Sequence, residues 1–286
     1  MDFSFLSDPA GFGLSEGWLL PTLQSPYWKV LLAGLLNTLK VALPAWVLAM
    51  GFGLLVGLGQ LSTHPLLRAG CKGFVDVFRN VPLLIQLLAI YFAITQFLPV
   101  ASQAWTLAPG VLLSKSGLAF PALMGGESAA GGWVWQMPSI GRFSVEGGWV
   151  LSPEYLAVLT ALVVYTAAYV AEVVRAGVLA VRPGMRQAAL ALGLRPTQAS
   201  RHVVLPLALR IMVPSLSNQT LNLLKNASLG VAVGYPELVS VANTSINQSG
   251  KAVECVFIIL LVYALLSAVA ALGMNRINRR VNRGAL

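Results

Sequence analysis

Five hydrogen-bonding side chains interrupt one of the long apolar stretches of the chain. The amides of asparagine and glutamine donate and accept hydrogen bonds, whereas the ammonium of lysine only donates them. Helical spacing of i, i+4 and i+7 places Asn218, Asn222 and Lys225 on one face, with Gln219 and Asn226 on its flank. The chemistry that such a face offers is reversible binding of a polar ligand.

The composition of the chain is that of a membrane protein. Hydrophobic residues make up 57% and charged residues only 10% of the 286 positions, which is too apolar for an ordinary soluble domain. The cations that give the net charge of +9 fall in loops on one predicted side of the membrane. Their distribution therefore indicates orientation in a membrane, and not nucleic-acid binding.

The polar stretch has two possible uses inside a bilayer. Its amides bond to neighbouring helices, a common role of Asn and Gln in membranes, or they line a path for a ligand. An unpaired Lys225 is more costly, by about 2.5–3.5 kcal/mol. Its partner is then a helix-end carbonyl, an acidic group of another chain or the carboxylate of a ligand. Gln86, one turn after Pro82, is a further candidate for a polar group on the same path.

Five stretches are long and apolar enough to cross a bilayer as helices. The cation-bearing loops fall on one side if the N-terminus is outside and the C-terminus inside. We therefore predict an all-α polytopic membrane protein with about five transmembrane helices. Its predicted parts are an external N-terminal segment at 1–29, one transmembrane domain at 30–280 with spans at about 41–61, 79–98, 155–174, 211–233 and 253–273, an external loop at 99–153, a cytoplasmic loop at 182–207 and a cytoplasmic tail at 281–286.

The cytoplasmic loop differs in composition from the spans on either side of it. Residues 187–192 favour a helix, and Gly193 to Pro196 end it, so a helix-turn-helix is predicted. Its arginines place it on the cytoplasmic side. A small helical knob without catalytic residues suits docking into a cleft of a soluble partner. A plain connector between two spans is the alternative.

The spacing of Gln187-Ala188-Ala189, Gly193 and Val203-x-Leu205-Pro206 resembles a known motif. This motif, E-A-A-x3-G-x9-I-x-L-P, is the coupling loop of permease subunits of bacterial ATP-binding-cassette importers. Gln187 departs from it, because the motif has glutamate there. Three other segments resemble the polar amino-acid permease family, so the resemblance covers roughly residues 30–280; they are FRNVPLLIQLL from Phe78, SKSGLAFP from Ser114 and GYPELVS from Gly234.

The resemblance implies the transmembrane domain of a type I importer. Its nearest branch handles general L-amino acids or glutamate, glutamine, aspartate and asparagine. The implied substrates are polar L-amino acids, acidic, amide or neutral, which a periplasmic binding protein delivers across the bacterial inner membrane. The residues implied to couple transport to the ATPase are Gln187, Ala188, Ala189, Gly193 and Pro206.

The chain has no Gly-rich phosphate loop, so it is expected not to be an enzyme by itself and to hold no cofactor. ATP and Mg²⁺ are expected on separate ATPase subunits. A second permease subunit is also expected, and Gln187 favours a heterodimer in which the other subunit carries the glutamate.

A self-contained secondary amino-acid transporter or channel is the alternative function. Five spans, the lack of a detectable internal repeat and the lack of an acidic residue in the middle of any span argue against it. A membrane enzyme is disfavoured further, because the sequence holds no nucleophile–base set and no cluster of metal ligands.

Charged residues and glycines also predict contacts between helices. Arg79 is either an anchor at the inner interface or a partner for Asp76. Glu172 and Arg175, at i and i+3, are predicted to form a structural ion pair. The small-residue row Gly53-x3-Gly57 predicts close approach of another helix.

Overall fold

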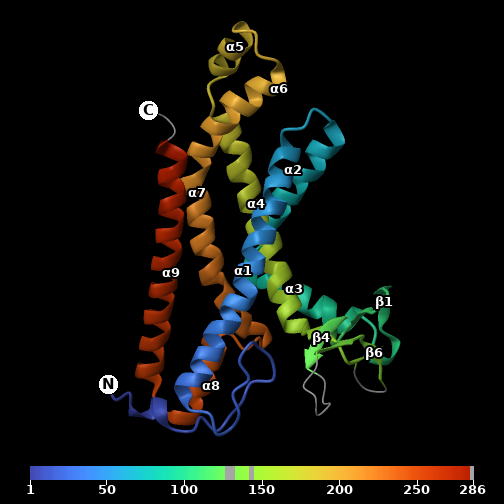
Figure 1. Cartoon of the computed structure of the whole chain (residues 1–286), viewed down its shortest axis with the longest axis vertical. Coiled ribbons are helices and arrows are strands. Elements are labelled where there is room, and N and C mark those ends of the chain that lie inside the picture. The colour runs from blue at the N-terminus through green and yellow to red at the C-terminus, as the bar shows by residue number, and fades with distance from the viewer. Residues whose placement is uncertain (126–132, 142–144, 284–286) are drawn as a thin grey trace. The chain divides into compact units, whose positions relative to one another are not determined.

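The computed structural model describes residues 1–125, 133–141 and 145–283. The chain folds into two compact units (Figure 1). The first comprises Met1–Pro82, Leu162–Ser228 and Pro236–Leu286, and the second comprises Leu83–Ala161 and Leu229–Tyr235.

Helices dominate the first unit. Its long members are rich in leucine, valine and alanine, and α1 alone has 34 residues, or about 50 Å at 1.5 Å per residue. The helices with residues in this unit are α1 (Tyr27–Gln60), α2 (Pro65–Asn80), α4 (Pro153–Leu179), α5 (Pro183–Ala191), α6 (Pro196–Ala199), α7 (Leu205–Asn226), α8 (Leu238–Ser249) and α9 (Ala252–Arg283), with short helical turns η1 (Ser4–Ser7) and η4 (Ser200–Val204).

Small residues bring α1 and α4 into close contact, as the glycine row predicts. A Cβ atom at Gly53 would lie 2.6 Å from Val170, and one at Gly57 would lie 2.7 Å from the carbonyl oxygen of Ala171. Contacts of that length do not occur between real side chains. The two helix backbones can therefore approach this closely only because these α1 positions lack side chains.

Two further helix pairs hold the first unit together. α7 and α9 lie side by side (Figure 1), and the guanidinium of Arg210 donates to the carbonyl of Val281 at 3.3 Å. α8 packs against the N-terminal part of α1, where the backbone N–H of Leu238 donates to the hydroxyl of Thr38 at 3.1 Å. Figure 1 places α5 and α6 at the opposite end of this unit from α8.

The N-terminal segment folds back onto the same end as α8. Phe5 and Ala10 are buried with Tyr27, Leu238 and residues of α9. The ammonium of Lys251 lies 3.3 Å from the carboxylate of Asp2. The first helix begins at Tyr27, earlier than the span predicted from about Val41. The reason is that this packing supports the helix beyond the stretch needed to cross a bilayer.

Among the described residues, three helices are long and apolar enough to cross a membrane: α1, α4 and α9. The pair Pro65–Asn80 and Leu83–Phe97 makes a fourth if it is one broken span. The break falls at Val81, which is extended (φ −96°, ψ 128°) before Pro82, as the residue before a proline prefers. α7 is not in this set, because its polar residues interrupt the apolar sequence predicted to span at 211–233.

The predicted external loop at 99–153 is not simply a loop, because it contains strands. The second unit combines α3 (Leu83–Phe92), the start of α4 and the helical turns η2 (Ala93–Phe97), η3 (Ala101–Gln103) and η5 (Ala227–Val233) with an antiparallel sheet of order β1-β2-β3-β8. Two further pairs, β4–β5 and β6–β7, complete it. The strands are β1 (Trp105–Ala108), β2 (Val111–Ser114), β3 (Gly117–Phe120), β4 (Ala122–Gly125), β5 (Trp133–Gln136), β6 (Ser139–Ile140), β7 (Val145–Glu146) and β8 (Trp149–Leu151).

Candidate functional site

The helix-turn-helix predicted between two spans is present, as α5 and α6. Gly193 ends the first helix with a left-handed φ of +85°. Its N–H donates to Leu190 at 3.0 Å, and the N–H of Leu194 donates to Ala189 at 3.2 Å, the paired bonds of a Schellman helix end. A Cβ at Gly193 would meet nothing within 4 Å. The backbone conformation, and not lack of space, therefore favours glycine.

The most exposed large apolar side chain of this helix-turn-helix, hereafter the knob, is a leucine that the motif does not include. Leu192 is 85% exposed, at the turn between α5 and α6. Of the two motif alanines, Ala188 is exposed but Ala189 is only 4% exposed, so its methyl group packs inside the knob. The exposure of Leu192 was not predicted from the sequence, because this residue completes the apolar pattern of α5. Its position next to the turn glycine, Gly193, was the feature of the sequence that could have indicated it.

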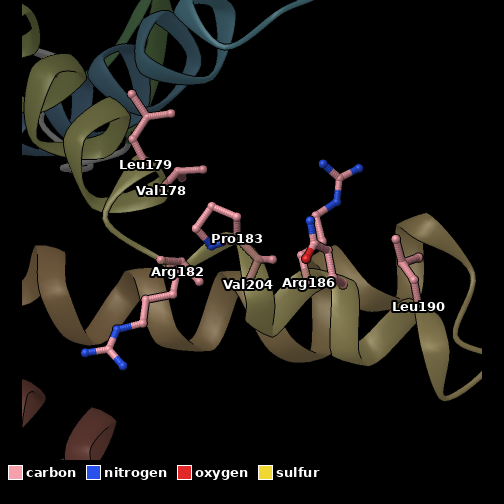
Figure 2. A pocket seen from close by; sticks show the side chains of 9 residues that line it. Val178, Leu179, Arg182, Pro183, Arg186, Leu190 and Val204 are labelled. Carbon is pink, nitrogen blue, oxygen red and sulfur yellow. The ribbon is translucent and has the colours of Figure 1, made fainter.

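Figure 2 shows a cavity at the base of the knob, about 390 Å³ in volume, between the end of α4, α5 and η4. Arg182 and Arg186 point away from each other, with Pro183 and Val204 between them (Figure 2). Gln187 also lines this cavity. Unlike the glutamate of the motif, its neutral side chain adds no negative charge beside these arginines. Pro206, the last residue that the resemblance implies for coupling, is half-buried in the first turn of α7.

The structure keeps three of the predicted ligand-path residues on one open face of α7. Asn218, Asn222 and Lys225 are exposed, and Gln219 and Asn226 on the flank are half-buried. The opposite face of the helix is covered by the chain itself, with Met212 and Leu223 buried. Trp46 of α1 donates to the hydroxyl of Thr220 there, at 3.0 Å.

Gln86 does not share this exposed position. It lies in α3, in the second unit, and is only 6% exposed.

An ion cluster joins α2 to α4 in the first unit. The predicted pair forms, with the guanidinium of Arg175 donating to both carboxylate oxygens of Glu172 at 2.6 and 3.1 Å. Arg79 lies 4.0 Å from the same carboxylate and stacks over the ring of Tyr169 at 5.2 Å. The observed partner of Arg79 is therefore Glu172, and not the exposed Asp76.

Removing the shared carboxylate should weaken this helix contact. In Glu172→Gln, two guanidinium groups lose their ionic partner, and we expect about 1–2 kcal/mol less stability, since all three side chains are partly exposed. Thermal unfolding of the purified protein in detergent measures the change. Asp76→Asn is the matched control, with an expected change below about 0.5 kcal/mol. A larger loss in Asp76→Asn than in Glu172→Gln would mean that Asp76 holds Arg79.

A second carboxylate, which sequence reasoning did not single out, is fully buried at the start of α8. Glu237 accepts from the N–H groups of Val239 and Ser240 at 2.9 and 2.8 Å, and from the hydroxyl of Tyr263 at 3.3 Å. Burial raises the pKa of Glu237 to about 7, although these hydrogen bonds lower it in part. The signal available in the sequence was its position before α8, where an acidic residue caps a helix.

No group of three or more His, Cys, Asp or Glu side chains suited to a metal ion occurs among the described residues. His64 instead caps α2, accepting from the N–H of Leu67 at 3.5 Å.

A family model described as the inner membrane component of binding-protein-dependent transport systems matches residues 49–283. The chain belongs to this permease family. The match includes α5, α6 and the whole polar face of α7. The permease is also 35% identical to the general L-amino acid transport system permease protein AapQ of Rhizobium johnstonii, over 98% of the chain and 83% of AapQ.

A second relative is the putative amino-acid ABC transporter permease protein YhdX of Escherichia coli, 34% identical over 98% of the permease and 85% of YhdX. Among solved structures, an amino acid ABC transporter with histidines has a chain that superimposes with a TM-score of 0.65 and 24% identity, covering 89% of the permease and 95% of that chain. This likeness shows the fold, that of a type I importer permease, as the sequence resemblance implied.

Proposed function

We propose that this chain is the membrane-spanning subunit of an ATP-driven importer that moves polar L-amino acids into the cytoplasm across the bacterial inner membrane. The family name supports delivery by a separate binding protein, which we place on the periplasmic side. The names of AapQ and YhdX support an amino acid as the substrate. Acidic, amide and neutral side chains are all compatible with the general L-amino acid transport named for AapQ.

The observation that carries the proposal is the open polar face of α7. An α-amino acid presents a carboxylate and an ammonium, so a site inside a bilayer must supply donors for one and acceptors for the other. Lys225 and the amide N–H groups of Asn218 and Asn222 supply donors, and the amide oxygens supply acceptors. These side chains are exposed in the single chain, and an open polar face is costly in lipid.

A second permease subunit is the proposed cover for this face, with the substrate passing between the two. We favour a different chain over a second copy, because Gln187 lacks the charge of the motif glutamate. ATP and Mg²⁺ belong to separate ATPase subunits that dock on α5 and α6. Native mass spectrometry of the complex that shows two copies of this chain and no other permease would contradict the heterodimer.

Replacing Asn222 by leucine tests the substrate path. Leucine keeps the size of the side chain but removes its polarity, so we expect at least about tenfold slower amino-acid uptake into proteoliposomes, from loss of hydrogen bonds to a charged ligand. Assembly with the ATPase should be unchanged. Asn275→Leu makes the same substitution at an exposed position beyond the apolar part of α9 and should transport normally.

Normal uptake by Asn222→Leu would assign this face to helix packing alone. The alternative function, a self-contained transporter or channel, predicts a different result in the same assay. Uptake by this chain without ATPase subunits and ATP would support that alternative and contradict the importer.

A further inference from the structure

One face of the four-stranded sheet in the second unit is apolar from edge to edge. Its strand register aligns a row of directly opposed residues, in the order Trp105, Leu113, Leu118 and Leu151. Side chains opposite each other in an antiparallel sheet share a face. The adjacent row on this face includes Phe120 opposite Trp149, whose rings are 6.0 Å apart.

The chain covers the middle of the other face of the same sheet, whereas Thr106 and Val150 in its edge strands are exposed. Its corresponding row contains Thr106, Leu112, Ala119 and Val150. Leu112 is 5% exposed and Ala119 only 1%, and they pack with Ala104. By contrast, Leu113 and Leu118 in the middle of the Trp105 row are half-buried, and Trp105 itself is 54% exposed. The middle of the sheet is therefore less covered on the Trp105 face than on the other face.

An apolar groove of about 440 Å³ begins where this face meets the helices of the second unit. Leu113 and Leu118 form its sheet side, and Ile90, Ile94 and Leu156 form its helix side. Among the described residues that line it, only Thr160 carries a polar side chain. A volume in the range of about 300–1,000 Å³ is typical of a ligand site.

The helix walls of this groove belong to segments suited to cross the membrane. Leu156 lies in α4, and Ile90 and Ile94 lie in Leu83–Phe97, the second helix of the bent pair that makes a fourth span if it is one broken span. Next to them Phe92 and Phe97 are 54% and 83% exposed. The groove thus continues an apolar surface that has lipid as its natural environment.

The charge and aromatic content of the segment between Pro99 and Pro153 also favour a position at the boundary of the lipid bilayer. Between Pro99 and Pro153 the sequence has two cations and two anions, so it is neutral overall. Its net charge therefore provides no attraction to a strongly charged protein partner. Trp133, Trp135 and Trp149 are 76%, 56% and 51% exposed, and tryptophan concentrates where acyl chains meet headgroups.

We propose that this groove binds the acyl chain of a phospholipid from the outer leaflet, with the Trp105 face of the sheet lying on the headgroup boundary. The sheet then rests against the membrane surface instead of projecting into the periplasm. Only contacts with hydrocarbon hold the lipid. The site therefore distinguishes lipids by their acyl chain and by the depth of that chain in the membrane, and not by the charge of the headgroup.

Fluorescence quenching by brominated lipid tests this placement in the assembled importer. Nanodiscs are prepared with phosphatidylcholine brominated near the headgroup end of its chains. The fluorescence of Trp105 is obtained by subtracting the emission of the Trp105→Phe variant from that of the wild type. The matched control moves the indole by one residue, in the double variant Trp105→Phe with Thr106→Trp. We expect the indole at position 105 to be quenched at least about twofold more strongly than the indole moved to position 106, because successive strand side chains point to opposite faces.

Native mass spectrometry after mild delipidation tests the groove separately. Leu113→Gln should retain fewer phospholipids than the wild type, whereas Thr106→Gln, on the opposite face, should retain as many. Equal quenching at positions 105 and 106, or unchanged lipid retention in Leu113→Gln, would overturn the proposal. A change in Trp105 emission on adding the binding protein, without quenching by bromine, would assign the face to that protein instead.

Discussion

Replacing Gly193 by valine is expected to lower substrate-stimulated ATP hydrolysis of the assembled importer by at least about tenfold, because a left-handed conformation costs an L-residue about 1–2 kcal/mol and a β-branched one more. Gly193 has a φ of +85° and closes α5 with two backbone hydrogen bonds. Valine would favour a different turn, and the exposed Leu192 would then no longer be presented in the same place.

Gly184→Val is the matched control for this experiment. Gly184 lies in the same helix, α5, and a Cβ there would meet nothing within 4 Å. It is not among the glycines with positive φ in the described residues. Valine should therefore be tolerated, and coupled ATP hydrolysis should remain. Full substrate-stimulated activity of Gly193→Val would show that the conformation of this turn does not control coupling.

Features that depend on neighbouring residues were predictable from the sequence. The turn at Gly193, the spacing of Asn218, Asn222 and Lys225 on one face, and the Glu172–Arg175 pair all follow from helical periodicity and from the conformational preferences of glycine and proline. Each involves residues within one or two helical turns of one another.

Features that depend on distant residues were not predictable. Arg79 pairs with a carboxylate 93 positions further along the chain, Glu172, whereas the only partner that the sequence offered as one of two alternatives was its neighbour Asp76. The strands between residues 105 and 151 were missed for a related reason. All eight described strands have four residues or fewer, too short to display the alternation that identifies a strand, and pairing with other strands stabilises them.

The buried state of Glu237 also depends on distant parts of the chain. In the sequence it stands in GYPELVS, which indicates only an external turn. In the structure, Leu238 of the same turn bonds to Thr38 of α1, and the hydroxyl of Tyr263 from α9 donates to Glu237 itself. Three segments far apart in sequence are thus joined around one carboxyl group.

Because Glu237 is buried, we expect the folded protein to lose stability as the pH rises from about 5 to about 8. The pKa of Glu237 is raised from 4.5 to about 7 in the folded state, chiefly by burial. The folded state therefore binds more protons than the unfolded state between these values. The resulting stabilisation is complete below pH 4.5 and is lost as pH rises through 7, with a total of about 3 kcal/mol.

Thermal unfolding in detergent, measured across this pH range, tests the prediction by comparison with Glu237→Gln. Glutamine stays neutral, so the variant should lose the part of the pH dependence that Glu237 supplies and be more stable than the wild type at pH 8. Glu254→Gln changes a half-buried carboxyl group that accepts from the N–H of Asp2 at 3.0 Å; it is the control and should keep the wild-type slope. Parallel curves for the wild type and Glu237→Gln would mean that Glu237 is already ionised at pH 5, stabilised by the N–H groups of Val239 and Ser240.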